Sequence, residues 1–289
     1  MPQINQQEML NAGVHFGHLK KKWNPKMSPY IFMEHKGIHI IDLNKTATNL
    51  EKAGSALRAI ARSGRKILFV ATKKQAKDIV YAAAQSVNMP FVTERWLGGM
   101  LTNFSTIRKS VKKMQNTERM LEDGTLQNIT KKERLMLTRE KENQFRVLGG
   151  IAALNRIPSA IFIVDISHEH IALTEAQKLG IKTFAMVDTN SDPTQVDFAI
   201  PANDDAAKSI SLVTNYIVSC IREGLEERRK EKEVEDARSA SATADAGSTE
   251  TKTRARTRRR KNNDEDANAA DDNNSMEDVA EESESGAEE

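Results

Sequence analysis

The sequence predicts an α/β fold built on a parallel sheet, and three observations support this. Short, almost wholly apolar runs alternate with helical patterns, which is typical of strands buried on both faces. The chain of 289 residues is long enough to bury a sizeable core. Its single cysteine, Cys220, lies in a helical pattern and predicts a buried structural thiol, which excludes a disulfide framework.

The N-terminal part predicts a small substructure that precedes the sheet. A short amphipathic helix is expected over residues 5–12, followed by a polar and basic loop over residues 13–26. Two extended runs, residues 30–34 and 37–41, are separated by two residues and predict a β-hairpin whose turn uses Gly37.

The remaining body alternates strands with helices. Asp42 is a helix-start signal, and Gly64 ends the pattern that follows it. The expected strands are residues 66–71, 91–92, 160–164, 183–187 and 198–200, and the expected helices are residues 44–63, 74–87, 169–179 and 206–229.

A segment without strand signals interrupts this alternation and predicts an inserted antiparallel helical hairpin. Gly124 breaks the helical pattern, and Thr130 with Glu133 forms a capping-box signature for a second helix. The first helix carries a heptad seam whose polar position is Glu118. The apolar seam residues are Ile107, Val111, Met114 and Leu121. The expected organisation is an α/β body of residues 1–104 and 149–229, a coiled-coil-like hairpin of residues 105–148, and a tail of residues 230–289.

Charge is distributed unevenly along the chain. Residues 1–229 contain 33 basic and 23 acidic residues, a net charge of +10, whereas residues 230–289 contain 10 basic and 18 acidic residues, a net charge of −8. The basic body predicts a polyanionic partner, either nucleic acid or an anionic membrane surface. The tail lacks aromatic residues and isoleucine, so it cannot offset the entropy of ordering, and we expect it to be disordered.

The motifs of common enzymes are absent from the sequence. It contains neither of the two glycine-rich phosphate-binding motifs, Gly-x-x-x-x-Gly-Lys-Ser/Thr and Gly-x-Gly-x-x-Gly. The turn after the first core strand contains Lys73 and Lys74 but no glycine. These lysines favour binding of backbone phosphates, or they only solvate a helix start. No nucleophile elbow or zinc-protease motif occurs, and Ser167 is a natural N-cap. We expect no catalytic activity.

Acidic residues follow two neighbouring strands and suggest a divalent-metal site. The carboxyl ends of parallel strands share one edge of a sheet, so these carboxylates can converge there with a histidine from the N-terminal loop. Alternatively, Asp188 and Asp204 cap helices and stabilise turns. The candidate ligands are His18, Asp188, Asp192 and Asp204.

Basic residues interleaved with aromatic residues and glycines predict RNA binding. Lysine and arginine neutralise phosphates, and exposed tryptophans stack on unpaired bases. Alternatively, Trp96 and Phe104 fill the core, and the lysines of the hairpin form an ordinary solvated face. The candidate RNA-binding residues are Lys20, Lys21, Lys22, Trp23, Lys26, Lys73, Lys74, Arg95, Trp96, Asn103, Arg108, Lys109, Lys112 and Lys113.

Several long motifs resemble those of a known family, the bacterial small-subunit ribosomal protein S-two. The resemblance covers residues 4–229 in order and spacing. The matching motifs are Ala12-Gly-Val-His-Phe-Gly-His, Trp23-Asn-Pro-Lys-Met, Tyr30-Ile-Phe, Gly37-Ile-His-Ile-Ile-Asp-Leu, Glu94-Arg-Trp-Leu-Gly-Gly-Met-Leu-Thr-Asn-Phe, Asp188-Thr-Asn-Ser-Asp-Pro and Ile200-Pro-Ala-Asn-Asp-Asp.

The resemblance implies a flavodoxin-like three-layer α/β/α domain with a protruding helical hairpin. It also implies a structural, non-catalytic role on the small ribosomal subunit, in the bacterial cytoplasm, with no required cofactor, no small-molecule substrate and no membrane partner. The implied partners are ribosomal RNA, ribosomal protein S-one, which acts in translation initiation, and neighbouring small-subunit proteins. Two alternatives remain at this point: a metal-dependent enzyme acting on a phosphosugar or nucleotide, and a hairpin that serves as a protein-docking arm.

Overall fold

The predicted parallel sheet is present. The structure is a computed structural model, and it describes residues 5–122 and 130–264. The chain divides into two units, Met1–Glu231 and Lys232–Glu289. The first unit contains a five-stranded sheet in the order β5-β4-β6-β7-β8, and all neighbouring strands run parallel. The strands are β4 (Ile67–Val70), β5 (Phe91–Val92), β6 (Ala160–Val164), β7 (Lys182–Val187) and β8 (Phe198–Pro201).

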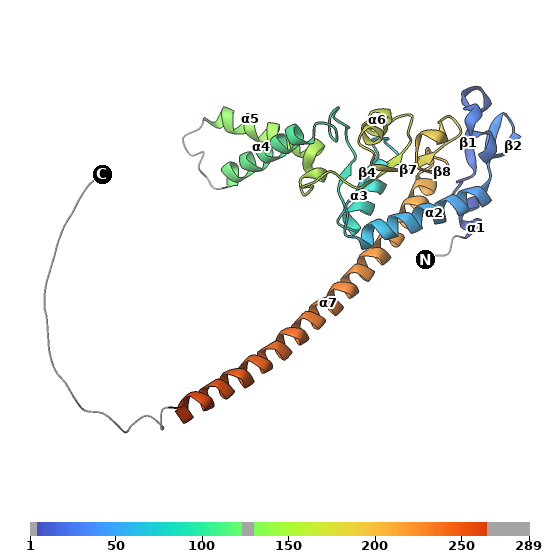
Figure 1. Cartoon of the computed structure of the whole chain (residues 1–289). Coiled ribbons are helices and arrows are strands. Elements are labelled where there is room, and N and C mark those ends of the chain that lie inside the picture. Colours follow the sequence, from blue (N-terminus) through green and yellow to red (C-terminus); the bar gives the residue numbers. More distant parts are fainter. Residues whose placement is uncertain (1–4, 123–129, 265–289) are drawn as a thin grey trace, which may run out of the picture. The chain divides into compact units, whose positions relative to one another are not determined.

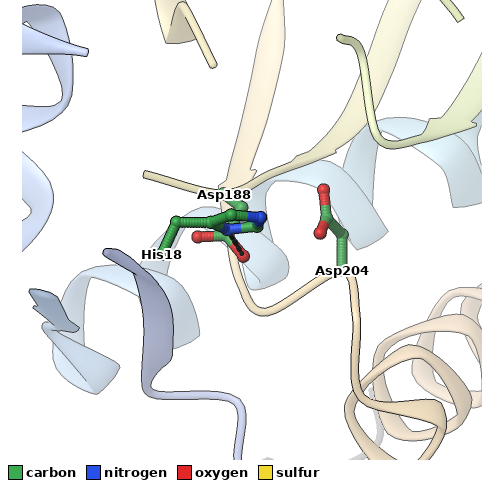
Figure 2. A group of neighbouring side chains, drawn as sticks. All are labelled: His18, Asp188 and Asp204. Carbon is green, nitrogen blue, oxygen red and sulfur yellow. Dashed lines mark ion pairs between the residues drawn. The ribbon is translucent and has the colours of Figure 1, made fainter. Parts of the chain in front are cut away.

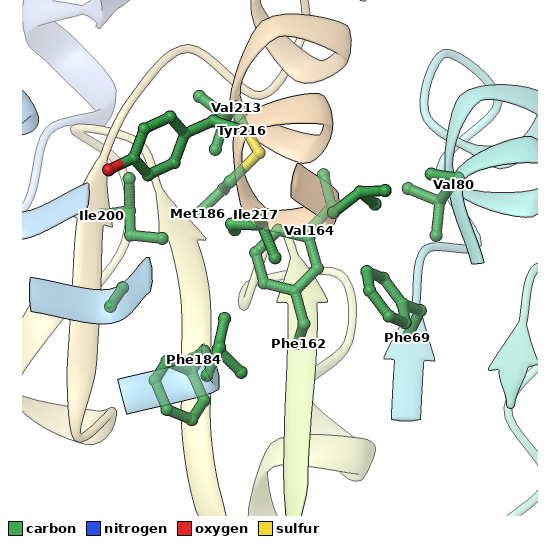
Figure 3. Packing of buried hydrophobic residues seen from close by; sticks show 14 of the residues in the cluster. Phe69, Val80, Phe162, Val164, Phe184, Met186, Ile200, Val213, Tyr216 and Ile217 are labelled. Carbon is green, nitrogen blue, oxygen red and sulfur yellow. The ribbon is translucent and has the colours of Figure 1, made fainter. Parts of the chain in front are cut away.

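Both faces of this sheet are buried, as the apolar strand runs predict. Side chains of successive strand residues point to opposite faces, so each strand supplies two cores. Figure 3 shows part of one core, to which Phe69, Phe162, Phe184 and Ile217 belong. Burying a phenylalanine stabilises the fold by roughly 1.5–3 kcal/mol. The alternate strand residues form the second core on the other face: Leu68, Val70, Ile161, Ile163, Ala185 and Val187.

Helices cover both faces, which confirms the three-layer α/β/α fold. Four helices contribute to the first core: α1 (Gln6–Asn11), α2 (Leu43–Arg62), α3 (Lys77–Ser86) and α7 (Ala207–Asp264). The second core is covered by α6 (His170–Lys178). The start of α2 follows its predicted cap, because the Asp42 side chain accepts a hydrogen bond from the Asn44 N–H at 3.0 Å. None of the described helices is long and apolar enough to cross a membrane.

A second, three-stranded sheet precedes the large one. It consists of β1 (Phe16–Leu19), β2 (Ile31–His35) and β3 (Ile38–Ile41) in the order β1-β3-β2. The predicted hairpin is confirmed, and its turn residues Lys36 and Gly37 both have positive φ. The predicted loop over residues 13–26 is wrong in part, because it contains β1. This strand has only four residues and an irregular register with β3, so it leaves little periodic signal in the sequence.

The inserted segment forms the predicted pair of helices, α4 (Phe104–Glu122) and α5 (Lys131–Leu148), which lie side by side (Figure 1). Thr130 and Glu133 form the predicted capping box. Val111 and Met114 of the seam are buried. The polar seam position, Glu118, pairs with Lys141 of α5 at 2.8 Å. Gly124, the expected break, lies outside the described residues.

Helix α7 extends beyond its predicted end. The sequence predicts that the helix stops at residue 229 and that disorder begins at residue 230, whereas α7 continues to Asp264. The expectation of disorder for residues 230–289 depends only on their lack of apolar side chains to bury. Residues 230–264 are also rich in alanine, glutamate, lysine and arginine, which have high intrinsic helix propensity. The remainder of the expected tail, residues 265–289, lies outside the described residues.

Candidate functional site

Acidic loops that follow three strands meet at the carboxyl edge of the large sheet, where parallel α/β proteins usually place their functional residues. Asp165 follows β6, Asp188 follows β7, and Asp204 and Asp205 follow β8. Strand β1 of the small sheet brings His18 to the same edge. Figure 2 shows how His18, Asp188 and Asp204 face one another. We call these five residues the carboxylate cluster.

Three of the four predicted metal ligands converge in the carboxylate cluster. One ligand atom each from His18, Asp188 and Asp204 lies within 4.8 Å of the other two. His18 Nδ1 lies 3.0 Å from Asp188 Oδ2, and His18 Nε2 lies 3.4 Å from Asp205 Oδ2. Contact with the Asp188 carboxylate raises the pKa of His18, although burial opposes this. An imidazole nitrogen with two carboxylates is a donor set that zinc accepts.

A glycine allows β1 to approach this edge. A Cβ on Gly17 would lie 2.6 Å from Thr189 Cγ2 and 3.0 Å from the carbonyl oxygen of His39. The close approach also lets the His18 N–H donate to Thr189 Oγ1 at 2.8 Å. Gly17 therefore positions the only imidazole of the cluster against the loop that follows β7.

The structure does not bring the fourth predicted ligand, Asp192, together with His18, Asp188 and Asp204. Its carboxylate caps the short helix η4 (Pro193–Gln195) and pairs with Lys26 at 2.6 Å. Burial would raise the pKa of Asp192, but hydrogen bonds from Lys26 and Thr194 outweigh it and lower the pKa to about 2. Asp192 thus has a capping role, which the sequence analysis considered only for Asp188 and Asp204.

Lys73 is placed among the acids of the cluster, so the structure does not support its predicted contact with RNA. Its Nζ lies 2.6 Å from Asp205 Oδ1, 2.8 Å from Asp204 Oδ1 and 3.3 Å from Asp165 Oδ2. Burial favours the neutral amine, yet these acids raise the pKa of Lys73 overall. Three carboxylates therefore compete with any RNA phosphate for this ammonium.

One oxygen of Asp204 remains available within the cluster. Asp204 is fully buried, and its Oδ2 has no hydrogen-bond partner among the described residues, whereas Oδ1 is held by Lys73. Burial, together with the charges of Asp165 and Asp188, raises the pKa of Asp204 to about 7 despite Lys73. An unpaired buried carboxylate oxygen is costly, so the donor set fits a cation bound beside His18.

The loop over residues 96–102, expected to contact RNA, instead surrounds a buried glutamate. Glu175 of α6 accepts from Trp96 Nε1 at 3.1 Å and from the Gly99 N–H at 2.7 Å through Oε1. Its Oε2 accepts from the Leu101 and Thr102 N–H groups and from the Thr102 hydroxyl at 3.0–3.1 Å. These donors lower the pKa of Glu175 even though burial would raise it. The glutamate thereby anchors the segment that leads into α4.

Trp96 is therefore a core residue rather than a stacking surface. Its side chain is 7% exposed and belongs to the second core. The structure thus supports the alternative that Trp96 fills the core. Sequence reasoning missed Glu175, although a signal was present: an acidic residue stands on a helix face otherwise formed by Ala172, Leu173 and Ala176.

The N-terminal basic residues lie on two short helices, η1 (Lys20–Lys22) and η2 (Pro25–Tyr30). Lys21 and Lys22 are exposed, whereas Lys20 pairs with Glu34 at 2.7 Å. Lys26 is engaged by Asp192, as described above. Trp23 is half-buried, with its ring centroid 5.1 Å from that of His39, so part of its ring is covered. We call residues 20–26 the N-terminal basic surface.

The second basic surface is the exposed side of α4, opposite its buried seam. Lys109, Lys112 and Lys113 are exposed, and Lys113 pairs with Glu140 at 3.1 Å. Arg108 bends back to the body, where it donates to the carbonyl oxygen of Ala152 at 3.2 Å and to Asn155 Oδ1 at 2.8 Å. We call Arg108, Lys109, Lys112 and Lys113 the hairpin basic surface.

Three further RNA candidates, Lys74, Arg95 and Asn103, are exposed. Asn103 Oδ1 accepts from the Thr106 hydroxyl at 2.8 Å at the start of α4. Six of the predicted cations are exposed and form no hydrogen bond or ion pair within the described part of the chain. They are Lys21, Lys22, Lys74, Arg95, Lys109 and Lys112.

The small sheet has an apolar face that sequence reasoning missed. Residues directly opposite in antiparallel strands share a face, and the register places Phe16 and Met33 opposite Ile40, and Leu19 opposite Ile38. Phe16, Leu19 and Met33 are exposed. Phe32, next to Met33 at the register irregularity of β2, is 70% exposed, and the register gives it no partner residue in β3. We call Phe16, Leu19 and Met33 the apolar sheet face, and Phe32 is an exposed ring beside it.

Comparison with known proteins agrees with the resemblance. The family model described as Ribosomal protein S2 matches residues 9–224. Small ribosomal subunit protein uS2 of Cytophaga hutchinsonii is 62% identical over 229 residues, covering 79% of this chain and 90% of that protein. The uS2 protein of Flavobacterium johnsoniae is 58% identical, with the same coverage. That of Bacteroides thetaiotaomicron is 57% identical over 232 residues, covering 80% of this chain and 84% of that protein.

These matches decide between the alternatives on activity. Proteins of this family are structural components and not enzymes, so the reading as a metal-dependent enzyme is dropped. The bacterial members are cytoplasmic and associated with the ribosome. A match over most of the chain, at identities well above half, shows that this chain belongs to the ribosomal protein S2 family and is a structural constituent of the small ribosomal subunit.

Proposed function

We propose that the chain binds ribosomal RNA through its two basic surfaces and thereby supports assembly of the small subunit. The observation that carries this proposal is the set of exposed cations that have no partner among the described residues, above all Lys109 and Lys112. They lie three residues apart on α4, on the side away from the buried Val111 and Met114. Neighbouring cations at this spacing neutralise adjacent phosphates and release their counterions.

The salt dependence of RNA binding tests this proposal. Lys109→Gln combined with Lys112→Gln should weaken binding of the full chain to a small-subunit RNA transcript. It should also reduce the slope of log affinity against log salt by roughly one per lysine. Lys52→Gln is the matched control, because Lys52 is exposed on α2 and outside both basic surfaces. An unchanged slope in the double variant would contradict the proposal.

The apolar sheet face supports docking of ribosomal protein S-one, the partner that the family resemblance implies. Exposed, contiguous apolar side chains on a folded protein usually mark a surface that another protein covers. Phe32 and Phe16 are large aromatic residues of the kind that anchor protein interfaces. Phe32→Asp should abolish co-purification of S-one with the subunit while leaving RNA affinity unchanged; retained S-one would contradict this assignment.

The carboxylate cluster supports binding of a divalent cation, for which the imidazole and carboxylate donors of His18, Asp188 and Asp204 suit zinc. The protein purified without chelators should contain metal by elemental analysis. Asp188→Asn and Asp204→Asn should lower that content. Asp192→Asn is the matched control, since Asp192 pairs with Lys26 outside the cluster. An equal metal content in the wild type and in all three variants would contradict the proposed metal site.

A further inference from the structure

A cavity of about 550 Å³ lies where the end of α5 meets the edge strand of the large sheet. Residues of α3 and β5 line it together with Phe145, Arg146, Gly149 and Gly150 (Figure 1 labels α3 and α5). None of the residues of the carboxylate cluster, the two basic surfaces or the apolar sheet face lines it. It is therefore a separate feature of the first unit.

Three aromatic rings contribute to the lining. Tyr81 is 43% exposed and Phe145 is 55% exposed, which is unusual for rings of this size, and Phe91 is half-buried. Tyr81 meets Phe91 edge to face, with centroids 5.0 Å apart. Gln85 Nε2 donates to the Tyr81 hydroxyl at 2.9 Å. The ring of Tyr81 is thus held in place while part of its surface stays open to a ligand.

Two consecutive glycines form the wall at the end of α5. A Cβ on Gly150 would lie 2.1 Å from the carbonyl oxygen of Phe91, so only glycine permits this approach to β5. A Cβ on Gly149 would lie 3.4 Å from the ring of Phe145. The backbone of Gly149 and Gly150 therefore lies close to the side chains of both Phe145 and Phe91.

Cations surround these rings. Lys66, Lys77 and Arg146 line the cavity together with the acids Asp78 and Glu94. Lys77 pairs with Glu94, whereas Lys66 Nζ donates to the carbonyl oxygen of Asn88 at 2.9 Å and keeps its positive charge unpaired by any acid among the described residues. This combination suits a nucleotide, because its base can stack on an aromatic ring and its phosphate can contact a cation.

We propose that this cavity receives one unstacked base of RNA, which stacks on Tyr81 and Phe145 while Lys66 and Arg146 contact the adjoining phosphates. The proposal rests on the proposed RNA binding of the chain and adds a base-binding site to it. The cavity also adjoins the end of α5, the helix that pairs with α4, which carries the hairpin basic surface. An aromatic side chain of a neighbouring protein would use the rings but not the cations, and it is therefore the less favoured occupant.

The test compares aromatic and charge variants of the full chain in equilibrium binding to a small-subunit RNA transcript over a series of salt concentrations. Tyr81→Leu and Phe145→Leu should each lower the affinity roughly 5- to 100-fold without changing the salt slope, since stacking releases no counterions. Lys66→Gln and Arg146→Gln should each reduce the slope by about one. Tyr81→Phe keeps the ring and should bind as the wild type does.

A second measurement uses only the wild-type protein, so it still tests the proposal if the variants do not fold. Ultraviolet irradiation of the wild-type complex, followed by mass spectrometry, should identify a peptide containing Tyr81 or Phe145 joined to a nucleotide. Unchanged RNA affinity in both leucine variants, with no such cross-link, would overturn the proposal. Unchanged RNA affinity with lost incorporation into the subunit would also overturn it and identify a protein occupant. Failure of the wild type itself to bind RNA would instead contradict the proposed function.

Discussion

Replacing Glu175 by glutamine tests whether one buried carboxylate holds the segment that leads into the hairpin. Glutamine keeps the shape of glutamate, but its amide has one acceptor oxygen and one NH2 donor in place of two acceptor oxygens. With the amino group at the Oε1 position, Trp96 Nε1 and the Gly99 N–H lose their acceptor. With the amino group at the Oε2 position, the Leu101 and Thr102 N–H groups lose theirs.

The expected cost follows from this count. Either orientation leaves two N–H donors without a partner, while the Thr102 hydroxyl can turn and accept from the glutamine NH2 group. Each unsatisfied buried donor costs about 1–3 kcal/mol, so Glu175→Gln should lower the free energy of unfolding by about 2–6 kcal/mol. Urea unfolding followed by tryptophan fluorescence measures it, because Trp96 itself reports on the loop. Glu226→Gln, an exposed position on α7, is the matched control. A loss below about 1 kcal/mol would refute the anchoring role of Glu175.

The same carboxylate predicts a pH dependence. The pKa of Glu175 is lowered on folding, so its stabilising contribution is complete above the pKa of an unfolded glutamate, about 4.3. That contribution is lost as the pH falls through the lower pKa of the folded state. The difference in unfolding free energy between wild type and Glu175→Gln should therefore shrink in acid. A difference that is constant from neutral pH down to pH about 3 would contradict the linkage.

Three further substitutions test other parts of the structure. Gly17→Ala places a Cβ 2.6 Å from Thr189 Cγ2 and should cost about 1–3 kcal/mol of unfolding free energy in a urea titration; equal stability would show that β1 does not need this close approach. Lys73→Met removes the ammonium from three carboxylates and should cost about 3–5 kcal/mol at pH 8. The deficit should be smaller at pH 6, where Asp204, whose pKa is already raised to about 7, takes up a proton; a deficit that grows on acidification would count against the cluster. Phe162→Ala opens a cavity in the first core and should cost about 3–5 kcal/mol by the same titration, and a loss under about 1 kcal/mol would mean that this core is loosely packed.

The large sheet and its helices could be predicted from the sequence because their signals are local. The strand that includes Phe162 reads as an apolar run, and the helix of residues 43–62 has a cap at Asp42 and a glycine stop at Gly64. Strand β1 could not be predicted, since its only partner is β3 and its pairing is irregular. Local patterns define elements, whereas pairing between distant segments depends on the assembled fold.

The site was predictable only in part, for a related reason. The shared carboxyl edge of parallel strands brings Asp188 and Asp204 together, and this follows from topology alone. Asp192 stands in the same loop as Asp188, but its side chain is turned toward Lys26, a residue 166 positions away. Likewise, the exposure of Trp96 depends on Glu175, which no local pattern connects to it. The direction in which a side chain points is decided by partners distant in sequence.

Sedimentation of a bacterial extract on sucrose gradients at low and high salt tests the central claim most directly. The chain is followed by immunoblotting and the small subunit by its ribosomal RNA. A structural constituent that binds RNA through many contacts should migrate with the small subunit at both salt concentrations. Recovery of the chain only at the top of both gradients, free of ribosomal RNA, would contradict the account.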